Sequence, residues 1–144
     1  MNLVKGNYVR LVKVHRRALS AVHLNSSLNF SELLTFENEV SLHIYFIQTS
    51  LGEIFKALNG LSPVFVAEIF ELSSHTRYSL RSGNRLRLPP ANTVTYGTRS
   101  LTFLDSLLWN RLPKSIKNST SILEFKRRLK TSSTKICFCS ICSD

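Results

Sequence analysis

The stretch that decides the fold runs from Ser41 to Gly60 and reads SLHIYFIQTSLGEIFKALNG. Its apolar residues recur every three or four positions, as they do in an α-helix with one buried face. They are Ile44, Ile47, Leu51, Ile54, Phe55 and Leu58. Gly60 then stops the helix, because glycine adopts the left-handed conformation that closes a helix C-terminus. We therefore predict a long central helix over about residues 41–59.

A basic amphipathic helix is predicted before the central one. Its apolar positions recur at helical steps between Tyr8 and Val22, while its cations occupy other faces. These cations are Arg10, Lys13, Arg16 and Arg17. The polar run Asn25-Ser26-Ser27 ends the helix.

Capping signals predict two more short helices. Asn29, followed three residues later by Glu32, is the pattern of a capping box and opens a helix through about Phe36. Ser62 and Pro63 supply an N-cap and a proline at the first helical position. The helix that they begin has the apolar members Val66, Ile69 and Phe70.

From Ser73 onward the apolar period shortens to two, which predicts short extended segments. Polar and apolar residues alternate over residues 77–81 and 85–88, with a possible turn at Gly83-Asn84, and Thr93–Tyr96 is a third β-prone piece. Two helices follow. One spans about Leu101 to Arg111 and stops before Pro113, and the other runs from a Ser121–Glu124 capping box to about Lys130.

Together these elements predict a mainly α fold: a small irregular helical bundle, short extended segments, a C-terminal helix and a disordered cysteine tail. We divide the chain into a helical region (1–72), a basic region (73–131) and a flexible tail (132–144) on the basis of composition.

Charge is distributed unevenly along the 144 residues, whose 19 Lys and Arg against 9 Asp and Glu give a net charge of +10. Residues 1–17 carry +5, residues 18–76 carry −5 and residues 77–135 carry +11. The apolar stretches are too short to cross a bilayer, and basic residues interrupt the N-terminal apolar run before a secretory leader can form. We expect a protein of the nucleus or cytoplasm that is not secreted and has no membrane partner. An Arg-rich mitochondrial transit peptide in residues 1–31 is an alternative.

Catalytic motifs are missing from the sequence. The two aspartates, Asp105 and Asp144, form no carboxylate pair for Mg²⁺, and no glycine-rich phosphate loop or nucleophile elbow is present. We predict no enzyme activity and no cofactor. Cys137, Cys139 and Cys142 are a candidate metal site if a fourth ligand is supplied, and a redox-sensitive tail with free thiols is the alternative.

The basic residues predict contact with the backbone of RNA or DNA, without sequence readout. Arginine bonds phosphate with two donors, and the interleaved Tyr78 and Tyr96 add stacking surfaces. The candidate binding residues are Arg10, Lys13, Arg16, Arg17, Arg77, Arg81, Arg85, Arg87, Arg99, Lys126, Arg127, Arg128 and Lys130.

Several runs, taken in order, resemble the C-terminal region of reverse transcriptases from jockey-like non-LTR retrotransposons. The runs are His15–Leu19 (HRRAL), Glu53–Pro63 (EIFKALNGLSP), Arg77–Arg81 (RYSLR), Tyr96–Leu101 (YGTRSL), Leu108–Pro113 (LWNRLP), Ser121–Lys130 (SILEFKRRLK) and Cys137–Cys142 (CFCSIC). Leu24-Asn25 and Tyr45-Phe46-Ile47 depart from the family's usual text, as in a decayed or partial copy.

The resemblance implies the thumb and post-thumb part of a polymerase whose catalytic aspartates lie in a palm domain upstream. Template and product handling is then the expected role, without polymerisation by this chain. Alternatively, the chain packs against a reverse transcriptase palm domain supplied by another polypeptide, or is a functionless remnant. An exposed apolar stripe on the helix over 41–59 would favour this alternative.

Overall fold

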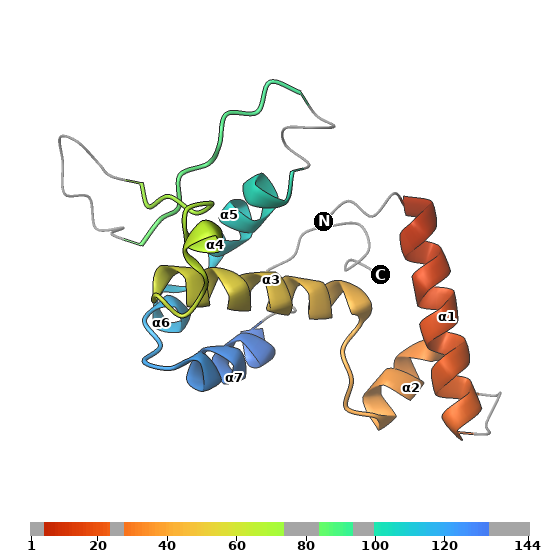
Figure 1. The fold of residues 1–144 in the computed structure, drawn as a ribbon. Helices are drawn as coiled ribbons and strands as arrows, with labels where there is room; N and C mark the ends of the chain where they lie inside the picture. The colour runs from red at the N-terminus through yellow and green to blue at the C-terminus, as the bar shows by residue number, and fades with distance from the viewer. Residues whose placement is uncertain (1–4, 24–27, 74–83, 94–99, 133–144) are drawn as a thin grey trace. The chain divides into compact units, whose positions relative to one another are not determined.

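The computed structural model describes residues 5–23, 28–73, 84–93 and 100–132 (Figure 1). These residues are mainly helical, as predicted. The helices are α1 (Lys5–His23), α2 (Phe30–Phe36), α3 (Leu42–Leu58), α4 (Val64–Ala67), α5 (Leu101–Arg111), α6 (Lys114–Lys117) and α7 (Ile122–Ser132). The chain separates into two compact units between Tyr45 and Phe46.

The unit before this boundary contains α1 and α2. The predicted capping box is confirmed: the Asn29 side chain accepts from the backbone N–H of Glu32, and Glu32 Oε2 accepts from the backbone N–H of Asn29 at 2.7 Å. The two helices meet through edge-on aromatic contacts. The rings of His15 and Phe30 lie 5.7 Å apart between centroids. The α1 helix thus presents one face to α2 and leaves the rest of its circumference for other contacts.

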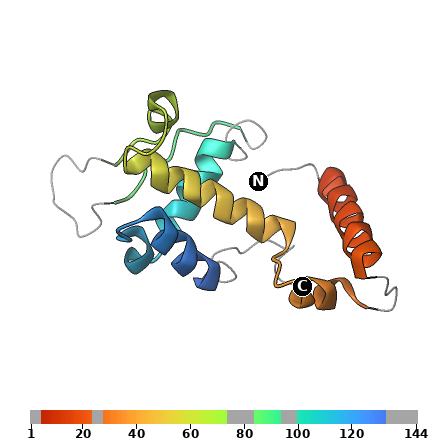
Figure 2. The ribbon, with the colours of Figure 1, turned by 60° about the horizontal axis from the view of Figure 1, so that its bottom comes forward.

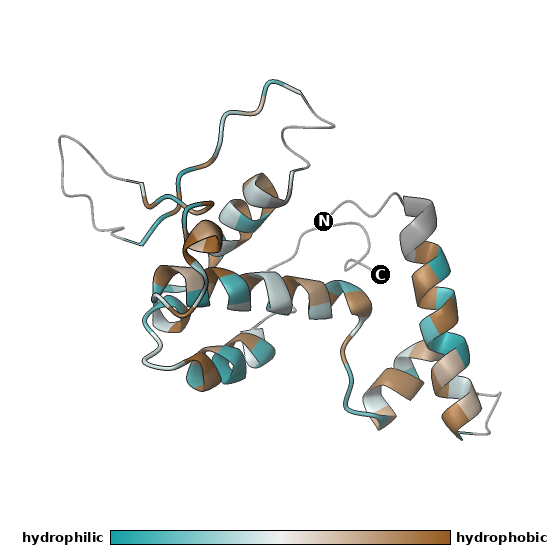
Figure 3. Cartoon of the chain, viewed as in Figure 1, coloured by the Kyte–Doolittle hydropathy of each residue, from teal (hydrophilic) through white to brown (hydrophobic). Residues whose placement is uncertain are grey.

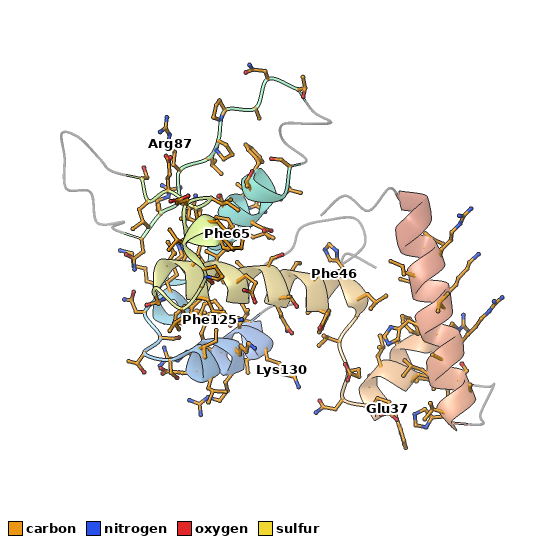
Figure 4. All side chains as sticks on the ribbon, viewed as in Figure 1. Glu37, Phe46, Phe65, Arg87, Phe125 and Lys130 are labelled. Carbon is orange, nitrogen blue, oxygen red and sulfur yellow. The ribbon has the colours of Figure 1, made fainter. Side chains whose placement is uncertain are left out.

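The unit from Phe46 onward has an aromatic core that joins three helices. Phe125 on α7 stacks on Phe55 of α3 with 4.4 Å between ring centroids, and on Trp109 of α5 with 6.0 Å. Figures 1 and 2 show α7 running alongside the C-terminal half of α3, and Figure 4 shows Phe125 between them. The predicted apolar stripe of α3 is buried in this unit at Ile47, Leu51, Ile54 and Phe55. Position 72, a boundary drawn from composition, therefore lies inside a unit with a shared core.

The end of α3 follows the predicted pattern. Gly60 has a positive φ of 69°, the N–H of Leu61 donates to the carbonyl of Lys56 at 2.8 Å, and the N–H of Gly60 donates to that of Ala57 at 3.4 Å. This pair of bonds is a Schellman motif, which satisfies carbonyls that the helix itself leaves without donors.

The α4 helix differs from the prediction by one position. Pro63 has an extended ψ of 148° and is the N-cap rather than the first helical residue, and no side chain caps the helix. Helical backbone angles therefore begin only at Val64, and α4 is a single turn that ends at Ala67. Ile69, predicted as part of its apolar face, is 49% exposed.

The predicted extended segments contain no strand where the structure describes them. Within residues 84–93 and 28–73, β pairing consists of one isolated antiparallel bridge between Leu72 and Leu86. The backbone bonds Ser73 N–H to Arg85 carbonyl and Arg87 N–H to Glu71 carbonyl, both 2.8 Å, support it. Residues 85–88 thus lie against the segment after α4, whereas residues 77–81 fall outside the described residues.

The C-terminal helices are close to prediction, with one revision. Ser121 Oγ accepts from the N–H of Glu124 at 3.2 Å, as expected. Glu124 Oε2 instead accepts from the backbone N–H and the hydroxyl of Thr120, at 2.9 and 2.8 Å, so the reciprocal bond is made one residue earlier. The single turn α6, which starts after Pro113, was not predicted.

Candidate nucleic-acid interface

The predicted cations of α1 share one side of the helix. At about 100° per residue, Arg10, Lys13, Arg16 and Arg17 fall within a sector of about 120°, and all four are exposed. The helix contains no acidic residue. Nitrogen-tipped side chains extend from one side of the α1 ribbon in Figure 4. The four cations therefore form one continuous basic surface of α1, and their contact with nucleic acid stays a prediction.

The packing of α2 orients this basic surface. His15 lies about 160° around α1 from the middle of the cation sector, and His23 lies beside Arg16. Their rings meet Phe30 and Phe36 of α2 at centroid distances of 5.7 and 4.9 Å. His23 Nε2 also contacts the Glu37 carboxylate, an ion pair when the histidine is protonated. Because α2 packs against the side of α1 with His15 and His23, Arg10, Lys13 and Arg17 face away from it, and Arg16 lies at the edge of this contact. Figure 3 shows that hydrophilic and hydrophobic residues both contribute to the surface of α1.

The α7 cations form a second basic surface with one exception. Lys126, Arg127 and Lys130 are exposed and lie within about 100° of one another around the helix. Arg128 instead has structural partners: its guanidinium pairs with Glu124 Oε1 at 2.6 Å and donates to the carbonyl of Ser115. Arg128 therefore ties α7 to α6, and its assignment as a nucleic-acid contact is revised.

Glu124 is the anchor of this arrangement. Hydrogen bonds from the backbone and hydroxyl of Thr120 lower the pKa of Glu124, with smaller contributions from Arg128 and Arg127. The carboxylate therefore stays ionised at neutral pH and holds Arg128 in place. Among the predicted contacts of α7, Lys126, Arg127 and Lys130 then remain as the basic surface.

The segment 84–93 carries two predicted cations with different surroundings. Arg87 Nη1 pairs with Glu71 Oε2 at 3.2 Å, and both side chains are exposed, so the pair adds little to stability. Figure 4 shows Arg87 pointing away from the helices. Arg85 has no such carboxylate among its described contacts, and its positive charge acts on Lys117 of α6.

Hydrogen bonds hold this segment against α5 and α6. Asn110 of α5 bonds both the N–H and the carbonyl of Leu86, at 2.8 and 2.9 Å. The indole Nε1 of Trp109 donates to the carbonyl of Asn84 at 3.1 Å, and Asn84 Nδ2 donates to Asn118 Oδ1 at 3.4 Å. The backbone on both sides of Arg85 is therefore fixed by Trp109 and Asn110 of α5 and by Asn118, the residue after α6.

Lys114 and Lys117 are basic residues of this region that we did not single out from the sequence. The ammonium of Lys117 lies over the Trp109 ring, 5.7 Å from its centroid. Burial lowers the pKa of Lys117, and the charges of Arg85 and Lys114 lower it further. The available signal was their three-residue spacing after Pro113, which places both on one face of a helical turn.

The remaining predicted site residues lie outside the described part of the chain. They are Arg77, Arg81, Arg99, the aromatic residues Tyr78 and Tyr96, and the cysteines Cys137, Cys139 and Cys142. Within the described ranges, no group of three His, Cys, Asp or Glu side chains is placed to hold a metal ion. No described helix combines the length and the apolar character needed to span a membrane.

Asp105 is a buried carboxylic acid on α5. It is 6% exposed, burial raises its pKa to about 6, and a hydrogen bond from the Ser50 side chain opposes that shift. Because Asp105 is buried and bonded to Ser50 of α3, we interpret it as a structural group.

Comparison of the chain with models of protein families, with curated proteins and with solved structures finds no match in any of the three. The basic surfaces are therefore interpreted below from their own geometry.

Proposed function

We propose that this protein binds the backbone of RNA or DNA without reading its sequence, as a non-catalytic relative of the region that follows the palm in retrotransposon reverse transcriptases. The observation that carries the proposal is the basic face of α1, where four exposed cations share one sector of a helix without acidic residues. Each cation along such a helix face adds to the attraction of a polyanion.

The dimensions of the α1 surface suit a phosphate backbone. From Arg10 to Arg17 the helix rises about 10 Å, a length that covers about three phosphates of one strand of a duplex. Long arginine and lysine side chains reach phosphates at several registers, because each needs only an oxygen acceptor rather than a particular base edge. Binding of this type is strong at low salt and indifferent to sequence.

The α7 surface adds a second set of contacts in the other unit. Lys126 and Lys130 are four residues apart and share an exposed face with Arg127, beside the buried Phe125 and Leu129. The aromatic core fixes that face outward. We infer that both surfaces contribute phosphate contacts. We also infer that this chain does not catalyse polymerisation, since its two aspartates, Asp105 and Asp144, are far apart in sequence and form no carboxylate pair there.

The test is the salt dependence of binding to labelled single-stranded RNA, single-stranded DNA and duplexes of unrelated sequence. With about 4–6 phosphates engaged, the logarithm of the association constant should fall against the logarithm of salt concentration with a slope of about −3 to −5. Oligonucleotides of equal length but different sequence should bind alike. Affinity that does not change between 50 and 200 mM salt would contradict the proposal.

Charge variants make this experiment specific to α1. The triple variant R10Q/K13Q/R17Q should lower the magnitude of the slope by about 2–3, because each lost phosphate contact removes about 0.7–0.9. The matched control R10K/R17K keeps the charge and should bind nearly as the parent does. Unchanged affinity of the glutamine variant would remove α1 from the interface.

A second candidate function is contact with another protein, such as a palm domain supplied by a separate polypeptide. The stripe on α3 that would have favoured it is buried, but large apolar side chains between α3 and the segment 84–93 are 49–73% exposed: Leu61, Val64, Phe65, Ile69 and Leu72. Sedimentation of the protein at high salt separates the two functions. Protein association through the apolar surface persists at high salt, whereas binding to phosphates is lost. V64S/F65S should abolish any such association.

A further inference from the structure

A cluster of three cations lies beside the only tryptophan of the chain. Lys114 and Lys117 are three residues apart on the single turn α6, and Lys117 Nζ lies 5.7 Å from the centroid of the Trp109 ring. Arg85 comes from the segment 84–93, almost thirty residues earlier. The cluster therefore exists only because the fold brings the segment to α6.

Hydrogen bonds fix the residues on both sides of Arg85. The carbonyl of Asn84 accepts from the Trp109 indole at 3.1 Å, and the Asn84 side-chain amide donates to Asn118 Oδ1 at 3.4 Å. The backbone N–H and carbonyl of Leu86 are both bonded by the Asn110 side chain. Since Asn118 directly follows Lys117, these bonds place the Arg85 backbone next to the turn that carries Lys117.

Three cations held together in this way repel one another. Lys117 is also half-buried, so its ammonium has lost part of its water, and burial together with Arg85 and Lys114 lowers the pKa of that ammonium. An anion at the cluster would relieve this repulsion and replace the lost hydration.

We propose that Arg85, Lys114 and Lys117 form a binding site for one phosphate group, and that its ligand in the full complex is a backbone phosphodiester of the nucleic acid. The identity of that ligand rests on the proposed function. The guanidinium of Arg85 supplies paired donors, and the two ammonium groups supply charge from the other side. The Trp109–Asn84 and Asn110–Leu86 bonds act as positioning contacts rather than as ligands.

The site has a built-in reporter, because Trp109 is the only tryptophan and lies under Lys117. Titration of the full chain with inorganic phosphate, against sodium chloride of equal ionic strength, should change the Trp109 fluorescence with phosphate alone. The same titration with a short single-stranded oligonucleotide should give a saturable change at lower concentration. Equal responses to phosphate and chloride would overturn the site.

Variants separate the site from general electrostatics. K117Q and R85Q should each weaken oligonucleotide binding about fivefold to tenfold at 0.1 M salt and reduce the slope magnitude by about 0.7–0.9. Both should lose the phosphate-induced fluorescence change. K117R keeps the charge and should retain both properties, and R85Q, at an exposed side chain, guards against a folding defect in K117Q.

The control K126Q removes one charge from α7, away from the cluster. It should weaken oligonucleotide binding but leave the response of Trp109 to inorganic phosphate unchanged. If oligonucleotides bind with a steep salt slope while K117Q and R85Q behave as the parent, the site is wrong and the proposed function stands. If oligonucleotides do not bind but phosphate still changes the fluorescence, the site stands and the proposed function is wrong.

Discussion

The side chain of Asn110 bonds both backbone polar groups of Leu86, accepting from its N–H at 2.8 Å and donating to its carbonyl at 2.9 Å. A neighbouring strand would make the same two bonds, but here one amide side chain of α5 makes them. Leu86 is buried, so its backbone groups have little access to water and depend on these partners. The position of Arg85 follows from this contact.

Replacing Asn110 with alanine should destabilise the protein. N110A leaves a buried N–H and a buried carbonyl without partners, so we expect the free energy of unfolding to fall by about 2–4 kcal/mol. Urea unfolding measures this loss. The matched control N118A removes one exposed bond of 3.4 Å and should change stability by less than about 0.5 kcal/mol. Equal effects of the two variants would contradict the structural role of Asn110.

The aromatic core predicts a large difference between two neighbouring positions of α7. F125A removes the ring that joins Phe55 and Trp109 and should cost about 3–5 kcal/mol in unfolding free energy. L123A changes a side chain that is 77% exposed and should stay within about 0.5 kcal/mol. Similar losses at both positions would show that α7 does not pack on α3 through this face.

Two glycines of the α3 region should respond oppositely to alanine. G60A places a Cβ at a φ of +69° and should destabilise the protein by about 1 kcal/mol. G52A lies inside α3, and its Cβ would meet Lys126 Cε at an ordinary 4.0 Å, so better helix propensity should stabilise it by up to about 1 kcal/mol. Thermal or urea unfolding of both variants checks the signs. Loss of stability in G52A would mean that α7 packs more tightly on α3 than this contact indicates.

Asp105 predicts a distinctive pH dependence of stability. Burial raises its pKa from an ordinary value of about 3.8 to about 6, so the folded state binds the proton more tightly than the unfolded state does. Its contribution to stability is therefore complete in acid and is lost as the pH rises through about 6. Between about pH 4 and pH 7, the unfolding free energy of the parent relative to D105N should fall by about 2–3 kcal/mol.

Glu124 provides the contrast for this experiment. Its pKa is lowered, so its stabilising contribution is present at neutral pH and is lost as the pH falls through the folded-state pKa. The difference in unfolding free energy between the parent and E124Q should therefore fall as the pH falls. The difference between the parent and D105N should fall as the pH rises. Unfolding midpoints across the pH range give both difference curves, and two curves of the same sign would contradict the assignment of Asp105.

Helices with strong local signals were predictable. Capping at Asn29 and the stop at Gly60 involve partners within a few residues, so sequence spacing alone identifies them. The prediction was wrong where the deciding contact is distant or finely balanced. Pro63 became an N-cap because its ψ stays extended, and the Glu124 carboxylate bonded Thr120 instead of Ser121.

The basic surfaces show the same division. The spacing of Arg10, Lys13 and Arg17 already places them on one side of α1, because helical geometry is local. The i,i+4 spacing of Glu124 and Arg128 was a local signal for their ion pair, whereas the bond from Arg128 to the Ser115 carbonyl has no signal in the sequence. The bond to Ser115 depends on where α6 lies against α7.

The sequence by itself determined the helices α1, α2, α3, α5 and α7, the caps at Asn29 and Gly60, and the charge of each part of the chain, because these depend on neighbours within one or two turns. Only the tertiary structure decided that Arg85 meets Lys117 beside Trp109, and that the stripe of α3 is covered by α7. Contacts between segments twenty or more residues apart form when apolar rings and buried backbone groups find partners. Periodicity does not encode which partners those are.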